Sequence, residues 1–72
     1  MFIVVELQTN NEGSTAHIVT AHATRDEAES KFHSVLAAAA VSELALHAAV
    51  ILDAKGQVLG NGVYRHGEEN ED

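Results

Sequence analysis

The sequence predicts an α+β domain with the element order ββαββ, in which one helix packs on one face of a four-stranded antiparallel sheet. Three observations lead to this prediction. Segments rich in β-branched and aromatic residues are separated by turn-forming clusters. One segment repeats its apolar residues with helical spacing. Two of the four expected strands are apolar on both faces, which is typical of central strands.

The first two strands are expected to form a hairpin. Residues 2–8 (FIVVELQ) have the composition of a strand, and residues 9–14 (TNNEGS) contain the residue types that tolerate positive φ. Residues 15–21 (TAHIVTA) then read as the returning strand.

A helix is predicted from Arg25 to Val41. Thr24 and Glu27 form a capping box, in which the Thr24 hydroxyl accepts from the Glu27 N–H. The apolar stripe that follows consists of Ala28, Phe32, Val35, Leu36 and Ala39. The end of the helix is poorly marked because no Gly follows it. The alanines beside the stripe are good helix formers, and whether they also form a contact surface stays open.

The second hairpin follows the helix. Residues 46–52 (LHAAVIL) predict a strand, and Asp53-Ala54-Lys55-Gly56 predicts a turn with Gly56 in the left-handed region. Residues 57–65 form the fourth strand, whose Gly60 and Gly62 indicate an edge, a bulge or a close backbone approach. We expect one domain over residues 1–66 and a disordered acidic tail over residues 67–72.

The apolar character of the first and third strands predicts the spatial order 2-1-3-4. A right-handed helical crossover then joins the second and third strands over the first. The residues expected to face the helix are Ile3, Val5, Leu7, Ile18, Leu46, Val50, Leu52, Leu59 and Val63. The residues expected on the open face are Phe2, Val4, Val19, Ala49, Ile51 and Tyr64. A face this apolar predicts an interface, most simply with a second copy in a homodimer, or with another protein.

Size and charge restrict the function classes. The chain has 72 residues, 4 Lys+Arg against 11 Asp+Glu, a formal net charge of −7, and no Cys. The acidic balance argues against a direct nucleic-acid binder, and the absence of Cys excludes disulfides and thiolate chemistry. No signal peptide or membrane span is expected, so the predicted location is the cytoplasm.

Catalytic and metal-binding patterns are weak. Glu6, His17 and His47 are expected together on the open face, where they could hold Zn²⁺; the alternative is that the histidines are rim residues. No nucleophile elbow, paired acid and base or phosphate loop occurs. We therefore expect no enzyme activity and no cofactor.

The acidic tail offers a second functional hypothesis. Residues 67–72 (GEENED) could bind a basic surface of a nucleic-acid enzyme, making the protein an inhibitor or decoy. The simpler interpretation is that the tail keeps a small protein soluble.

Two segments carry a resemblance. The opening MFIVVELQTN (residues 1–10) and DEAESKFHSVLAAAAVS (residues 26–42) resemble short uncharacterised proteins of gut Firmicutes and their prophages. The resemblance spans nearly the whole chain before the tail. It implies a bacterial or phage origin and a structural or accessory role in assembly, and it implies no site residues.

Overall fold

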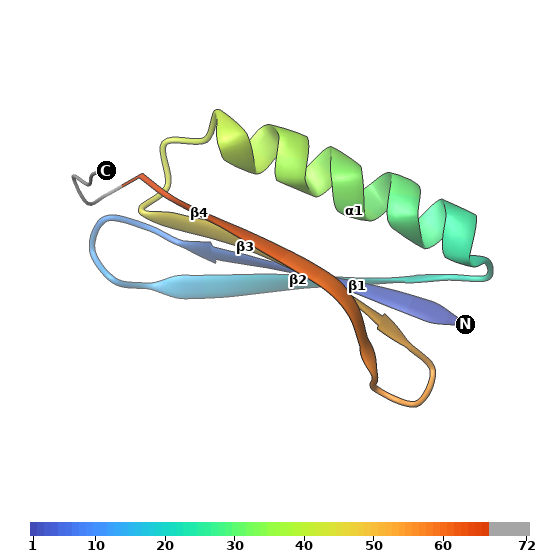
Figure 1. Cartoon of the computed structure of the whole chain (residues 1–72). Helices are drawn as coiled ribbons and strands as arrows, with labels where there is room; N and C mark the ends of the chain where they lie inside the picture. Colours follow the sequence, from blue (N-terminus) through green and yellow to red (C-terminus); the bar gives the residue numbers. More distant parts are fainter. Residues whose placement is uncertain (67–72) are drawn as a thin grey trace.

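The computed structural model describes residues 1–66. Its elements are β1 (Phe2–Thr9), β2 (Thr15–His22), α1 (Arg25–Ala40), β3 (Leu46–Asp53) and β4 (Val58–Arg65). The strands form one sheet in the order β2-β1-β3-β4, and every neighbouring pair is antiparallel. α1 lies along one side of this sheet (Figure 1). The predicted fold class and strand order are confirmed, while the predicted tail lies outside the described residues.

Both hairpin turns are built in the same way. Asn10 Oδ1 accepts from the backbone N–H groups of Glu12 and Ser14, at 2.9 and 3.0 Å. Asp53 Oδ1 likewise accepts from residues 55 and 57, both at 2.9 Å. The glycine three positions after each of these residues has positive φ, +91° at Gly13 and +83° at Gly56. An Asx side chain and a left-handed glycine therefore close each turn.

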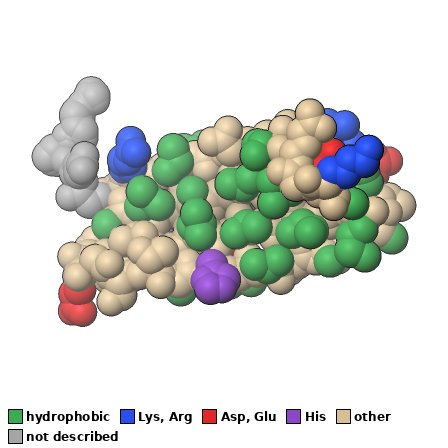
Figure 2. All heavy atoms as spheres, turned by 90° about the horizontal axis from the view of Figure 1, so that it is seen from below, with side chains coloured by type: hydrophobic (Ala, Val, Ile, Leu, Met, Phe, Trp, Pro, Cys, Tyr) green, Lys and Arg blue, Asp and Glu red, His purple; other side chains and the backbone are tan. Residues whose placement is uncertain are grey.

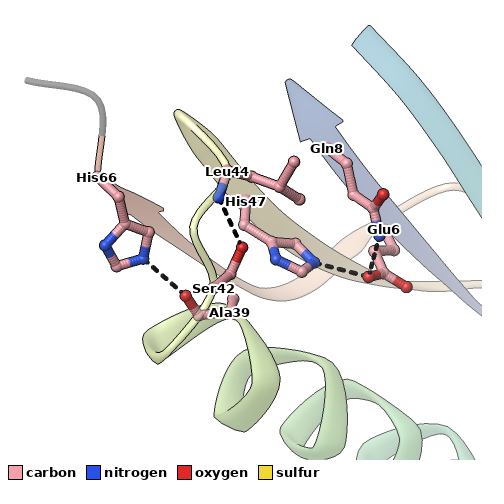
Figure 3. A network of polar contacts seen from close by, with 7 residues as sticks. All are labelled: Glu6, Gln8, Ala39, Ser42, Leu44, His47 and His66. Carbon is pink, nitrogen blue, oxygen red and sulfur yellow. Dashed lines mark hydrogen bonds and ion pairs between the residues drawn. The ribbon is translucent and has the colours of Figure 1, made fainter. Parts of the chain in front are cut away.

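The ends of α1 are held by different groups. At its start, the Glu27 N–H donates to the Thr24 hydroxyl at 3.2 Å, as the capping box predicts. At its end, the helix stops at Ala40, one residue before the predicted last position, and the N–H of the capping residue Val41 donates to the Ala38 carbonyl. His66, beyond β4, donates from Nε2 to the Ala39 carbonyl at 2.8 Å (Figure 3). This contact satisfies a carbonyl that the helix itself leaves free.

The core lies between α1 and the sheet and contains mostly small residues. The helix contributes Ala28, Phe32, Val35 and Ala39 to it. Glycines of β4 let the helix approach closely, since a Cβ atom added to Gly62 would lie 3.0 Å from the Leu36 methyl carbons. A Cβ added to Gly60 would lie 3.8 Å from the Phe32 ring. These glycines therefore serve the close approach that their positions indicated.

The described part of the chain contains no helix that is both long and apolar enough to cross a membrane.

Candidate functional site

The side of the sheet opposite α1 carries apolar side chains from its two central strands. Val4, Ala49 and Ile51 lie in one cluster with the helix, and side chains alternate along a strand, so the neighbours of these residues point away from the helix. These outward residues are Ile3, Val5 and Leu7 of β1 and Leu46, Ala48, Val50 and Leu52 of β3. We call this side the open face, because within residues 1–66 no segment covers it (Figure 1).

The edge strands extend the same surface. The strand register adds Val19 and Ala21 of β2 and Val58 and Val63 of β4 to the open face. Val19 is 56% exposed and Val63 is 45% exposed. Figure 2, which views this side, shows hydrophobic side chains across its middle and charged groups only near its two ends. The apolar surface therefore spans all four strands.

Acidic side chains are kept off the open face. Among the described residues they lie on the helix side, in the turns or on α1: Glu6, Glu12, Asp26, Glu27, Glu29, Glu43 and Asp53. The polar side chains that the register places on the open face are Thr9, Thr15, His17, Asn61 and Arg65. The negative charge of residues 1–66 is thus separated from this surface.

The predicted assignment of the two faces is wrong. Val4 is 1% exposed, Ile51 is 2% exposed and Ala49 is fully buried, all beneath α1, and Phe2 packs against the same cluster. These four residues therefore cannot form an outer interface.

The other two predicted interface residues have different outcomes. Tyr64 pairs with His47 and lies on the helix side, whereas Val19 does lie on the open face. Most residues expected to face the helix, including Ile3, Val5 and Val50, lie on the open face. Two were predicted correctly: Ile18, opposite Glu6, lies on the helix side, and Leu59 packs against the core.

The prediction assigned the two faces of the sheet the wrong way round. Both faces are apolar along β1 and β3, so the alternation of side chains alone does not show which face the helix covers. The prediction turned Ile3, Val5 and Leu7 toward the helix, and the alternation of β1 then placed Glu6 outward. The structure instead buries Glu6 beside His47, and the more apolar side remains open. A usable signal was present in Ala49, Gly60 and Gly62, because a packed helix needs small residues beneath it.

A polar network lies under the C-terminal half of α1 (Figure 3). His47 is 5% exposed, and its Nε2 donates to Glu6 Oε2 at 2.6 Å. Gln8 Nε2 donates to the same oxygen at 2.8 Å. The other imidazole nitrogen of His47, Nδ1, is buried without a hydrogen-bond partner. Glu6 Oε2 thus accepts both hydrogen bonds, and His47 is shielded from solvent.

The pKa of Glu6 results from opposing effects. Burial raises it, but hydrogen bonds from His47 and Gln8, together with the charges of His47 and Lys31, lower it, and the net pKa is below the ordinary value. Glu6 is therefore ionised at neutral pH. Its ionised form stabilises the folded chain at any pH above the value of an unfolded glutamate, about 4.5, and this contribution is lost as the pH falls through the lower, folded pKa.

Replacing Glu6 with glutamine is expected to lower stability at pH 7 by about 1–2 kcal/mol, because a charged hydrogen bond becomes a neutral one. The difference from the unmodified chain should shrink as the pH falls below about 4.5. This difference in stability is measured by thermal denaturation, followed by circular dichroism, at several pH values. Glu12→Gln, in an exposed turn, is the matched control. A difference that stays constant down to pH 3 would contradict this account.

The predicted metal site does not assemble. His17 lies opposite Leu7 on the open face, whereas Glu6 and His47 lie on the helix side. Within residues 1–66 no group of three or more His, Cys, Asp or Glu side chains is placed to hold a metal ion. The prediction that His17, Glu6 and His47 share a face is therefore wrong.

Comparisons with protein-family models, with curated proteins and with solved structures find no match to this chain. Two surfaces of the described residues are candidates for function. One is a depression lined by Gln8, Asn10, Ser14, Thr15, Ala16 and Leu44, none of which is titratable. The other is the open face, which is larger and involves every strand.

Proposed function

We propose that this protein is a small, non-enzymatic assembly module that binds a second copy of itself through the open face. The observation that carries the proposal is the continuous apolar surface formed by all four strands, opposite the side that α1 covers. A solvated sheet face normally alternates to polar residues. A large exposed apolar patch is typical of an interaction surface.

The size of the open face suits a dimer. Four strands of eight residues make a surface of about 19 by 26 Å, given about 4.8 Å between strands and about 3.3 Å per residue. Two such faces in contact cover at least about 1,000 Å², which is near the lower limit for a specific interface. Sheet-on-sheet packing at about −30° would bury both faces at once.

The charge distribution favours a second copy as the partner. Two chains of net charge −7 repel each other, yet none of the acidic residues described above lies on the open face. The face therefore carries little charge, so two copies can meet across it in the symmetric contact of a two-fold dimer without opposing acidic groups. The resemblance to prophage proteins also implies an assembly role.

The chemistry of the described residues gives no support to catalysis. Glu6 and His47 form the closest acid and base pair, but His47 is 5% exposed and Nε2 is already bonded. A general base must reach the proton that it removes. The open face offers an extended contact area, whereas small-molecule and catalytic sites are usually concave pockets.

Val50→Glu tests the proposal. Val50 lies on the open face of central strand β3, and a glutamate there places an unpaired charge in the centre of the interface. We expect the unmodified chain to sediment as a dimer at micromolar concentration and the variant as a folded monomer, with affinity reduced at least 100-fold. Ala37→Glu, on the exposed side of α1, adds the same charge elsewhere and should leave the dimer intact.

Two results would contradict the proposal. One is an unmodified chain that remains monomeric at millimolar concentration. The other is a Val50→Glu variant that associates as strongly as the Ala37→Glu control. Circular dichroism confirms folding, and Val50→Thr, which keeps the shape of the side chain, provides a milder variant with an intermediate affinity.

A further inference from the structure

The two edge strands of the sheet differ in their protection against pairing with another strand. The pairing of β4 with β3 has a register shift between Ile51 and Leu52, and β4 contains two glycines and ends at Arg65. β2 pairs with β1 without interruption and contains no Pro, Lys, Arg, Asp or Glu. Bulges, charges and prolines are the usual devices that prevent strand addition. β2 has none of these devices.

The register shows which backbone groups of β2 are free. The Asn10 N–H donates to the Ser14 carbonyl at 2.9 Å, so these two residues form a hydrogen-bonded pair of the antiparallel ladder. Bonded and non-bonded pairs alternate along such a ladder. The residues whose N–H and C=O groups point to the outer edge are therefore Thr15, His17, Val19 and Ala21.

We propose that β2 is a strand-addition site for β2 of a second copy, paired antiparallel about a two-fold axis through Ile18. This register places His17 opposite Val19 of the second copy and Thr15 opposite Ala21 of the second copy, so every outward residue is bonded. Ile18 then lies opposite itself, and no charges are opposed because β2 carries no acidic or basic side chain other than histidine.

The symmetry of this pairing and the absence of charged side chains on β2 favour a second copy as the binding partner. A second β2 matches the free edge in length and in its alternation of bonding groups, and it continues the sheet to eight strands. The contact is independent of the open face. Used together, the two contacts link copies into assemblies larger than a dimer.

Proline substitution on the two edges tests the proposal. Ala21→Pro removes an N–H that points outward and so leaves the bonds between β1 and β2 intact. Asn61→Pro, on the other edge, is the matched control: the Ala45–His66 bond places the Asn61 N–H outward by the same alternation. Both are made in the Val50→Glu chain, where the open face is disabled. We expect that chain and its Asn61→Pro version to dimerise at millimolar concentration, and Ala21→Pro to weaken dimerisation at least tenfold.

Amide hydrogen exchange gives a second readout. In the Val50→Glu chain, the exchange rate of the Val19 N–H should fall at least tenfold between micromolar and millimolar protein, while that of the Asn61 N–H stays constant. A Val19 amide that exchanges at the same rate at all concentrations overturns the proposal. Equal loss of association in both proline variants also overturns it. Because the open face is disabled throughout, neither outcome depends on the proposed function.

Discussion

Replacing Ile51 with glutamate is expected to unfold the domain. Ile51 is 2% exposed and packs with Val4 and Phe32 beneath α1, where a carboxylate has neither water nor a basic partner. The cost is several kcal/mol, comparable to the roughly 4–10 kcal/mol that stabilises a chain of this length. Circular dichroism at 25 °C should show loss of the folded signal.

Val50→Glu is the matched control for this experiment. The two residues are adjacent in β3 but point to opposite sides of the sheet, so Val50→Glu should remain folded. The comparison therefore tests the orientation of the sheet separately from association. The result that contradicts the structure is the reverse one, in which Ile51→Glu folds and Val50→Glu does not.

Phe32→Ala is expected to have the next largest effect, about 3–4 kcal/mol. Phe32 is the largest side chain in a core made mostly of Ala and Val, and its ring lies over Gly60. A glycine has no side chain to fill the cavity. The melting temperature, measured at fixed protein concentration, should fall by about 15 °C or more. Phe2→Ala, at the partly buried margin, should cost clearly less, and equal losses would contradict this packing.

The fold could be predicted from the sequence because each boundary had a local chemical signal. Thr24 and Glu27 marked the helix start, while Gly13 and Gly56 marked the turns, and all act within a few residues. The end of α1 had no such signal, because the side chain that bonds its last turn is His66, 27 residues beyond Ala39. Contacts between residues this far apart do not appear in local patterns.

The orientation of the sheet could not be predicted for a related reason. Val4 and Val5 are equally suited to a core, so the outcome depended on which face the helix could approach. Gly62 allows the helix to approach this face closely. The hydrogen bond between Glu6 and His47 satisfies the two polar side chains that the helix then covers. The open face was predicted to be an apolar surface, but of the residues predicted for it only Val19 lies there, and the others lie on the helix side.

The central claim is that the open face is covered by the same face of another copy. Isotope-filtered NMR on an equal mixture of labelled and unlabelled chains tests it directly. The account predicts intermolecular contacts between methyl groups of Val5, Leu7 and Val50 and those of the neighbouring chain. A spectrum at millimolar concentration in which these methyl groups contact only their own chain would contradict it.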